Sequence, residues 1–198
     1  MPSEPLILGF DTSAAHCAAA LLRGEEILVS RLEEMKRGQA ERLMPLLEEV
    51  LAEGGANWAD LDAIGVGIGP GNFTGIRIAV SAARGLALGL DVPAVGVTGF
   101  EARAADGVLP AVPAPRDQVY AALPGEAPRL MAAQEALDAA RGAGLGFAPE
   151  ASPAGIAEAI ARSAAARFRT ETAAPAPLYL RSAVAAPMRD APPALLDG

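Results

Sequence analysis

Cysteine, histidine and aromatic residues are scarce in this chain of 198 residues. It contains one Cys and one His, and the aromatic residues together make up 4% of the sequence. A single cysteine excludes an internal disulfide. A lone histidine with no Cys/His cluster around it also makes a zinc site a poor interpretation.

Basic charge is also in short supply. Sixteen Lys and Arg residues stand against 24 Asp and Glu, which gives a formal net charge of −8. Tight binding of nucleic acid depends on Lys and Arg that neutralise phosphates. We therefore do not expect the chain to bind tRNA or DNA tightly by itself, although another subunit of a complex could supply the positive surface.

Long apolar runs are missing too. No run approaches the length of a membrane span, because Arg84 interrupts the longest candidate, and no signal peptide precedes Leu6. The hydrophobic content is nevertheless 52%, enough for a sizeable core built mainly from Ala, Leu, Val and Ile. We expect a soluble, cytoplasmic protein that does not contact a membrane.

The most informative stretch covers residues 63–90. An apolar run that suits a buried strand, Ala63–Ile68, leads into a glycine-rich turn, and apolar residues then recur at helical spacing up to Leu90. A strand, a glycine turn and a helix can aim backbone N–H groups at an anion. The turn matches neither standard phosphate loop, because it has no lysine and its glycines alternate at 65, 67, 69 and 71 instead of following the dinucleotide spacing.

The remaining pattern predicts an α/β chain. Short apolar runs predict strands over Leu6–Phe10, Cys17–Leu22, Ile27–Leu32, Ala94–Val97, Val108–Val112 and Gln118–Leu123, the first three as an antiparallel meander. One helix is expected to begin near Pro45 or to be kinked there. Others are expected over Gly99–Ala105 with Thr98 and Glu101 as a capping box, over Met131–Arg141 and over Pro153–Arg167. A turn is expected around Pro113, Pro115, Arg116 and Asp117.

Two of these helices carry more apolar surface than one sheet contact needs. The helix that ends before Gly54 has a wide apolar stripe, and the helix that ends at Leu90 has a second face of mostly small residues that includes Gly85 and Gly89. Each of these glycines lowers helix propensity by about 1 kcal/mol relative to alanine. A packing partner that approaches closely would explain them; the alternative is a crossover helix buried on its own sheet.

Four motifs, taken together, resemble the bacterial TsaB family. They are GFDTS at Gly9–Ser13, GIGPGNFTGIRIA at Gly67–Ala79, GLALGLDVPAVGV at Gly85–Val97 and PLYLR at Pro177–Arg181, in matching order and spacing. The resemblance implies an actin-like ATPase (sugar kinase/Hsp70) fold of two lobes, each a mixed sheet flanked by helices, with the second lobe shortened. The expected division is an N-terminal lobe at 1–98, a smaller C-terminal lobe at 99–176, and a YLR segment with a loose tail at 177–198.

TsaB-like proteins are the small partner subunits in the making of threonylcarbamoyladenosine in tRNA. The resemblance therefore implies a subunit without catalytic or metal-binding residues that binds and stabilises the transferase TsaD. A small ATPase, TsaE, joins that assembly, and tRNA is met only indirectly. No cofactor is expected for the chain alone, with ATP and Mg expected only within the complex with TsaD and TsaE. A homodimer is expected when TsaD is absent.

The resemblance also implies which residues matter. The helices that match Glu41–Ala52 and Ile76–Leu90 are expected to contact the partner, through Leu43, Met44, Leu47, Val50, Leu51, Ile76, Val80, Ala83, Ala87 and Leu90. A vestigial phosphate loop would consist of Asp11, Thr12, Ser13, Gly69, Gly71, Asn72, Thr74, Gly75 and Arg77. Arg77 either binds an anion there or braces the loop.

Two features of the first strand end leave alternatives open. Asp11 and Thr12 either face metal-bound phosphates, as in actin-like ATPases, or satisfy backbone donors in their own turn. His16 and Cys17 follow without a recognisable base or second ligand, so we expect Cys17 in the core and His16 on a surface turn.

The chain departs from the family pattern in ways that argue against an independent nucleotide-handling or metal-dependent activity. Asn72 replaces the usual Ser, Ala79 the usual Gly and Gln39 a frequent His, and Val112–Pro115 replaces a run that contains an Asp. The alternatives are a weak ATPase or phosphotransferase that uses Asp11, Thr12 and the turn at 69–75, or a self-associating regulatory homodimer. A peptidase is disfavoured because it asks for metal ligands that one histidine does not supply.

Overall fold

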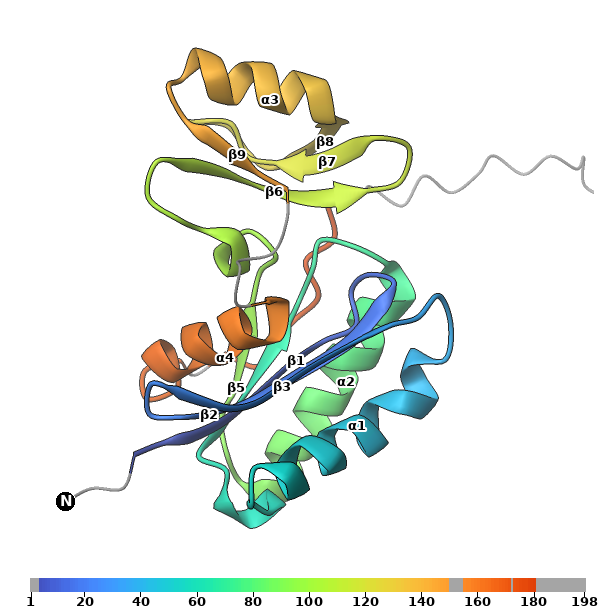
Figure 1. The fold of residues 1–198 in the computed structure, drawn as a ribbon, viewed down its shortest axis with the longest axis vertical. Helices are drawn as coiled ribbons and strands as arrows, with labels where there is room; N and C mark the ends of the chain where they lie inside the picture. Colours follow the sequence, from blue (N-terminus) through green and yellow to red (C-terminus); the bar gives the residue numbers. More distant parts are fainter. Residues whose placement is uncertain (1–3, 150–154, 172, 181–198) are drawn as a thin grey trace, which may run out of the picture.

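Two β-sheets, stacked along the long axis of the molecule, form the framework of the chain (Figure 1). The computed structural model describes residues 4–149, 155–171 and 173–180. The first sheet has five strands in the order β3-β2-β1-β4-β5, and the second has four in the order β8-β7-β6-β9. Both sheets mix parallel and antiparallel pairs, as the predicted fold requires.

The first sheet begins with the predicted meander. β1 (Leu6–Asp11), β2 (His16–Arg23) and β3 (Glu26–Glu34) pair antiparallel in sequence. β4 (Ala63–Gly67) pairs parallel to β1, and β5 (Ala94–Val97) pairs parallel to β4. All six residues of β1 and all five of β4 are buried, because helices cover both faces of the sheet.

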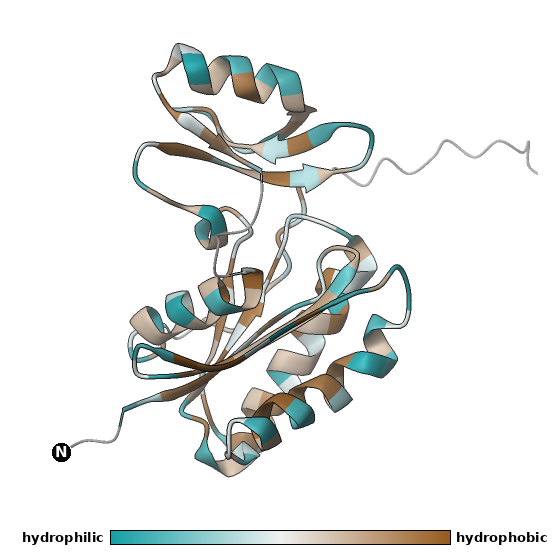
Figure 2. Cartoon of the chain, in the orientation of Figure 1, coloured by the Kyte–Doolittle hydropathy of each residue, from teal (hydrophilic) through white to brown (hydrophobic). Residues whose placement is uncertain are grey.

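One face of this sheet is covered by α1 (Gln39–Glu53) and α2 (Phe73–Leu90), and the other by α4 (Ile156–Arg167) (Figure 1). Figure 2 shows the apolar residues concentrated in the strands and on the helix faces turned toward them. α4 packs closely because Gly9 and Gly65 have no side chain: a Cβ on Gly9 would lie 2.7 Å from the carbonyl oxygen of Ala157.

α1 begins six residues before Pro45. We expected it to begin, or to be kinked, near Pro45, but the helix begins at Gln39 and Pro45 lies inside it. Proline removes one backbone donor from the helix. Leu43, two residues before the proline, is 1% exposed, so its packing against the sheet favours helix on the N-terminal side of the proline.

The second sheet is built from short strands. It contains β6 (Val108–Ala114), β7 (Gln118–Ala121), β8 (Arg129–Ala132) and β9 (Gly146–Ala148), with α3 (Ala133–Gly142) packed on one face. β8 and β9 were not predicted, since four and three residues give too little alternation to recognise. The turn between β6 and β7 places Arg116 and Asp117 at φ 64° and 53°, whereas Pro113 belongs to β6.

Two single turns of 3-10 helix complete the described elements, at Trp58–Asp60 and Glu101–Arg103. The second replaces the helix expected over Gly99–Ala105. Its predicted capping box is confirmed: the Thr98 N–H donates to Glu101 Oε2 at 2.6 Å, and the Glu101 N–H donates to Thr98 Oγ1 at 3.1 Å.

The predicted lobe boundary places α4 on the wrong side. The range 99–176 was expected to form the second lobe, but Ile156, Ile160 and Ala164 of α4 belong to a core cluster with β1, β2 and β5 of the first sheet. The second compact unit is therefore residues 108–148, and the chain returns to the first sheet afterwards. The expected loose tail beyond Leu180 and the expected helix start at Pro153 lie outside the described residues.

α2 also corrects the expectation that no segment approaches membrane-spanning length. Its 18 residues are long and apolar enough to cross a membrane by length and composition alone. In this fold the helix packs on β4 instead, with Ile76, Ala79 and Ala83 almost completely buried.

Candidate functional site

The turn between β1 and β2 packs directly against the glycine turn before α2. The Asn72 N–H donates to the Ser13 carbonyl oxygen at 2.7 Å, and the Thr12 hydroxyl donates to the Gly75 carbonyl oxygen at 2.7 Å. A Cβ on Gly71 would lie 2.4 Å from the Ser13 oxygen, and one on Gly75 only 1.9 Å from the Thr12 oxygen. The structure thus brings the predicted loop residues together, and places main-chain oxygens of residues 12 and 13 against the glycines.

Local chemistry explains the start of α2. Asn72 is the N-cap, and its side-chain oxygen accepts from the Gly75 N–H at 2.8 Å. Asparagine caps helices about as well as serine does, so the departure from the family pattern keeps this function. Gly69 has φ 97°, a conformation that favours glycine, and Thr74 is exposed.

Asp11 is held by its own turn. The carboxylate is 2% exposed, and its Oδ1 accepts from the Ser13 N–H at 2.9 Å, from the Ser13 hydroxyl at 2.9 Å and from His16 Nε2 at 2.6 Å. A Cβ on Gly67 would lie 1.9 Å from Asp11 Oδ2. The interpretation that Asp11 satisfies local donors therefore fits the structure.

His16 corrects a prediction. It begins β2 with a side chain only 16% exposed and pairs with Asp11, so it is not on a surface turn. Although Ser, His and Asp lie together, Ser13 bonds to the carboxylate and not to the imidazole. The histidine therefore cannot take the serine proton, which is the step that defines a Ser-His-Asp triad.

Most of the predicted partner-contacting side chains are inside this chain. Seven of the ten are at most 3% exposed: Leu43, Leu47, Val50, Leu51, Ile76, Val80 and Ala83. As contacting residues they were wrongly assigned, because the apolar stripe of each helix faces the chain's own sheet. Met44 is 36% exposed, and Ala87 and Leu90 are half-buried, so these three remain available to a partner.

The outward face of α2 is carried by other residues. Beyond its first two residues, the exposed positions are Arg77, Ser81, Arg84, Gly85, Leu88 and Gly89, and Leu88 is 86% exposed. A Cβ on Gly85 or Gly89 would have nothing within 4 Å. Nothing among the described residues therefore requires glycine at these two helical positions.

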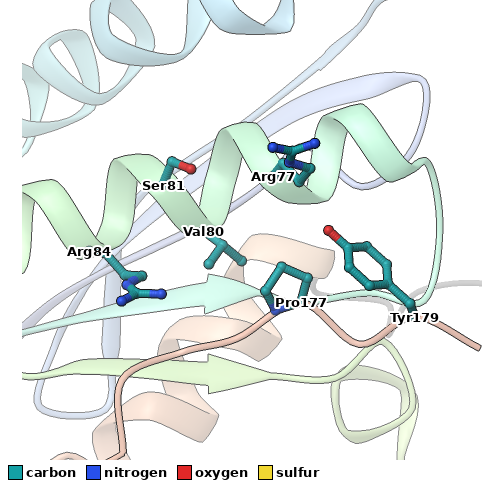
Figure 3. A pocket seen from close by; sticks show the side chains of 6 residues that line it. All are labelled: Arg77, Val80, Ser81, Arg84, Pro177 and Tyr179. Carbon is teal, nitrogen blue, oxygen red and sulfur yellow. The ribbon is translucent and has the colours of Figure 1, made fainter.

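A hollow of about 360 Å³ lies beside α2, against the C-terminal segment (Figure 3). It is lined by Arg77, Val80, Ser81 and Arg84 of the helix and by Pro177 and Tyr179. The segment is fixed there by the Leu178 N–H, which donates to the Ile68 carbonyl oxygen at 2.8 Å, and by the Tyr179 ring, 4.9 Å from that of Phe73. Arg77 lies over the Phe73 ring at 5.3 Å, so it braces the start of the helix.

On the opposite flank of the helix pair, Arg42 ties α1 to β3. Its guanidinium donates to Glu33 and to Glu49 at 2.6–2.7 Å. These hydrogen bonds lower the pKa of both carboxyl groups. The pairing therefore supports the fold at neutral pH and weakens as pH falls through those lowered pKa values.

A family model for the tRNA N6-adenosine threonylcarbamoyltransferase TsaD matches residues 31–185. The chain belongs to this family. Its curated relatives include TsaB proteins: those of Haemophilus influenzae and Bacillus subtilis are each 36% identical over 123 residues, 58% and 59% of this chain. These matches cover 51% and 54% of the relatives, so the chain spans about half their length. The predicted TsaB resemblance is confirmed.

Solved structures of the same kind confirm the fold. YeaZ from Pseudomonas aeruginosa is 35% identical, with a TM-score of 0.54 and 64% of each chain covered. A protein described as similar to peptidase YeaZ from that organism is 26% identical, with a TM-score of 0.68, and the match covers 89% of this chain and all of the other. The two-lobed actin-like architecture predicted for a TsaB-type chain is thus supported over nearly its whole length.

Sequence reasoning missed the contacts that define the glycine turn in this TsaB-family chain. The sequence pointed to Thr12, Ser13, Gly71 and Gly75 but did not predict that the β1–β2 turn packs against the glycine turn. The alternating glycines were the available signal, since glycine at close spacing marks positions where backbone approaches backbone.

Cys17 is in the core, as predicted, and has a testable consequence. Burial, with a smaller contribution from Glu33, raises its thiol pKa to about 11. The thiol should therefore stay protonated near pH 8, where little of it is the reactive thiolate. We expect negligible labelling by a thiol reagent in buffer and complete labelling in urea. Rapid labelling of the native chain would contradict the buried position.

Proposed function

We propose that this chain is the non-catalytic TsaB-type subunit of the machinery that makes N6-threonylcarbamoyladenosine at tRNA position 37, and that it binds and stabilises TsaD. The relatives named above carry the name "tRNA threonylcarbamoyladenosine biosynthesis protein TsaB", and the family model is that of TsaD. Because the chain spans about half of those relatives, their role comes to it as a proposal.

One observation carries the docking part of this proposal: the two outward glycines of α2. Gly85 and Gly89 weaken the helix by about 1 kcal/mol each, and no contact in the described part of the chain needs them. Small residues one turn apart let the backbone of a second helix approach closely, and the exposed Leu88 between them offers apolar surface. A helix of TsaD packed on this face would account for all three residues.

The arrangement at the glycine turn supports a non-catalytic role. Main-chain oxygens of Thr12 and Ser13 lie against Gly75 and Gly71, and Asp11 Oδ1 is engaged by Ser13 and His16 of its own turn. No buried side-chain nitrogen or oxygen in the described part of the chain lacks a hydrogen-bond partner. These contacts favour a subunit role over the alternative of a weak ATPase.

The rest of the proposal follows the family expectation. The chain acts in the cytoplasm, meets tRNA only through the complex, and forms a homodimer when TsaD is absent. TsaE joins the ternary assembly, and ATP with Mg is handled only there.

The test is co-purification of the full chain with TsaD. Wild-type chain should co-elute with TsaD, and Gly85→Leu with Gly89→Leu should weaken binding about a hundredfold or more, because two leucines on this face hold the partner helix away. Calorimetry measures the affinity, and thermal unfolding should show the variant chain at least as stable as wild type.

Gly142→Leu is the matched control. It places the same side chain at another helical glycine with nothing within 4 Å, at the end of α3 on the second lobe, and should bind TsaD as wild type does. Failure of the wild-type chain to bind TsaD would refute the proposed function. Normal binding by the double leucine variant would refute the assignment of the docking face.

A further inference from the structure

Two hollows adjoin along one side of α2. The hollow of Figure 3 lies at the end of the helix that carries Arg77, and a second one, of about 480 Å³, lies at the end that carries Leu88. Arg84 lines both of them. We call the two together the α2 groove; it follows the helix from Arg77 to Leu88, eleven residues or about 16 Å along the axis.

The α2 groove is apolar at one end and cationic at the other. The second hollow includes Leu88, Pro93 and Pro175, and Leu88 is 86% exposed. Arg77 and Arg84 are exposed, and neither forms an ion pair among the described residues. The groove therefore suits an extended segment with a carboxylate toward the arginines and apolar side chains beside Leu88.

The chain itself contains such a segment. Residues 181–198 are the longest stretch outside the described residues, and the last nine, 190–198, read DAPPALLDG. These nine contain two Asp and no Lys or Arg, and Leu195 and Leu196 are adjacent. Two consecutive prolines favour an extended polyproline conformation, which loses little entropy on docking.

The described chain also ends beside the α2 groove. Tyr179 lines the first hollow, and Leu180 is the last described residue. Residues 173–180 already lie against the groove, fixed by the Leu178 N–H bond to the Ile68 carbonyl oxygen. Residues 181–189 can span up to about 30 Å when extended, which is enough to reverse direction and return to the helix. About five further extended residues then cover the 16 Å or so of the groove.

We propose that residues 190–198 dock in the α2 groove of their own chain, with Asp190 toward Arg77 and Arg84 and with Leu195 and Leu196 beside Leu88. Because the segment is tethered to a wall of the groove, its effective concentration there is in the millimolar range, so a weak contact is enough to hold it. The docked segment covers Gly85 and Leu88, which also belong to the face proposed for TsaD. In the free chain it therefore shields that face.

A nitroxide label on the full chain tests this docking. Ala191→Cys introduces a thiol next to Asp190, and the buried Cys17 does not compete for the reagent. In the labelled chain, the amide NMR signals of residues 84–88 should lose most of their intensity relative to the same sample with the nitroxide reduced. Leu195→Asp with Leu196→Asp should restore these signals. The two substitutions lie outside the described fold, so they leave it intact and show what an undocked segment does.

Arg84→Glu gives a second, independent variant. It should also restore the signals, because the groove then repels Asp190. Arg141→Glu is its matched control: it makes the same change of charge at an exposed position on the second lobe and should leave the loss as large as before.

A mixed sample distinguishes the chain's own segment from that of another copy. Isotope-labelled chain without nitroxide, mixed with unlabelled chain that carries it, should keep its signals at residues 84–88. A loss there as large as in the singly labelled chain would place a second copy's segment in the groove and overturn the inference. Full signals in the labelled chain, or a loss that both leucine substitutions leave unchanged, would overturn it as well. TsaD is not added to any of these samples, so the result is independent of the proposed function.

Discussion

Replacing Leu47 by aspartate is expected to leave no stably folded chain. Leu47 is 0% exposed in the core cluster between α1 and the first sheet, so the substitution removes a buried apolar side chain and puts a charge in its place. Such a change should lower the free energy of unfolding by about 5 kcal/mol or more, which is comparable to the whole stability of a domain. Urea unfolding and the yield of soluble protein measure the loss.

Met44→Asp is the control for that experiment. Met44 lies one turn away on the same helix but is 36% exposed, so its aspartate can remain in water and the chain should unfold within about 1 kcal/mol of wild type. If Leu47→Asp folded as well as Met44→Asp, the assignment of Leu47 to the core would fail. Val80, at 3% exposure, should behave like Leu47, so neither position can test an interface.

Gly75→Ala is expected to destabilise the chain by about 3 to 5 kcal/mol. Helix propensity alone favours alanine over glycine by up to about 1 kcal/mol at this position in α2. The new Cβ would however lie 1.9 Å from the Thr12 carbonyl oxygen, so one of the two turns must move and the Thr12–Gly75 hydrogen bond is strained or lost. Thermal and urea unfolding measure the sign and the size of the change in the free energy of unfolding.

Gly85→Ala is the matched substitution with the opposite sign. It lies on the same helix with nothing within 4 Å of its Cβ, and should stabilise the chain by about 1 kcal/mol. Should Gly75→Ala prove equally stabilising, the two turns do not meet as the structure places them.

Secondary-structure elements with strong hydrophobic periodicity were predicted correctly from the sequence. Prediction failed for elements whose position depends on contacts between distant segments. The meander, β4, α2 and the Thr98–Glu101 box follow from local patterns. β8 and β9 are too short to show one, and Gln39–Met44 becomes helical because Leu43 packs on the sheet. The side of the sheet that α4 covers depends on its fit over Gly9 and Gly65, which lie about 150 and 95 residues away.

At the candidate site, too, local features were predicted and contacts between segments were not. Local sequence identified the glycine turn, the β1–β2 turn and the two outward glycines of α2. It assigned the wrong side chains to the partner surface because a hydrophobic stripe does not reveal whether it faces its own sheet or another molecule. The pairing of His16 with Asp11, five residues apart, required the geometry of the strand end.

The contact between the β1–β2 turn and the glycine turn also limits how this chain could evolve. The atoms pressed against Gly71 and Gly75 are the carbonyl oxygens of Ser13 and Thr12, and these are present whatever amino acid occupies positions 12 and 13. Exchanging the side chain at position 12 or 13 therefore does not remove these oxygens. Widening the space between the two turns would require the main chain of the β1–β2 turn to move, whereas the outer face of α2 can change one surface side chain at a time.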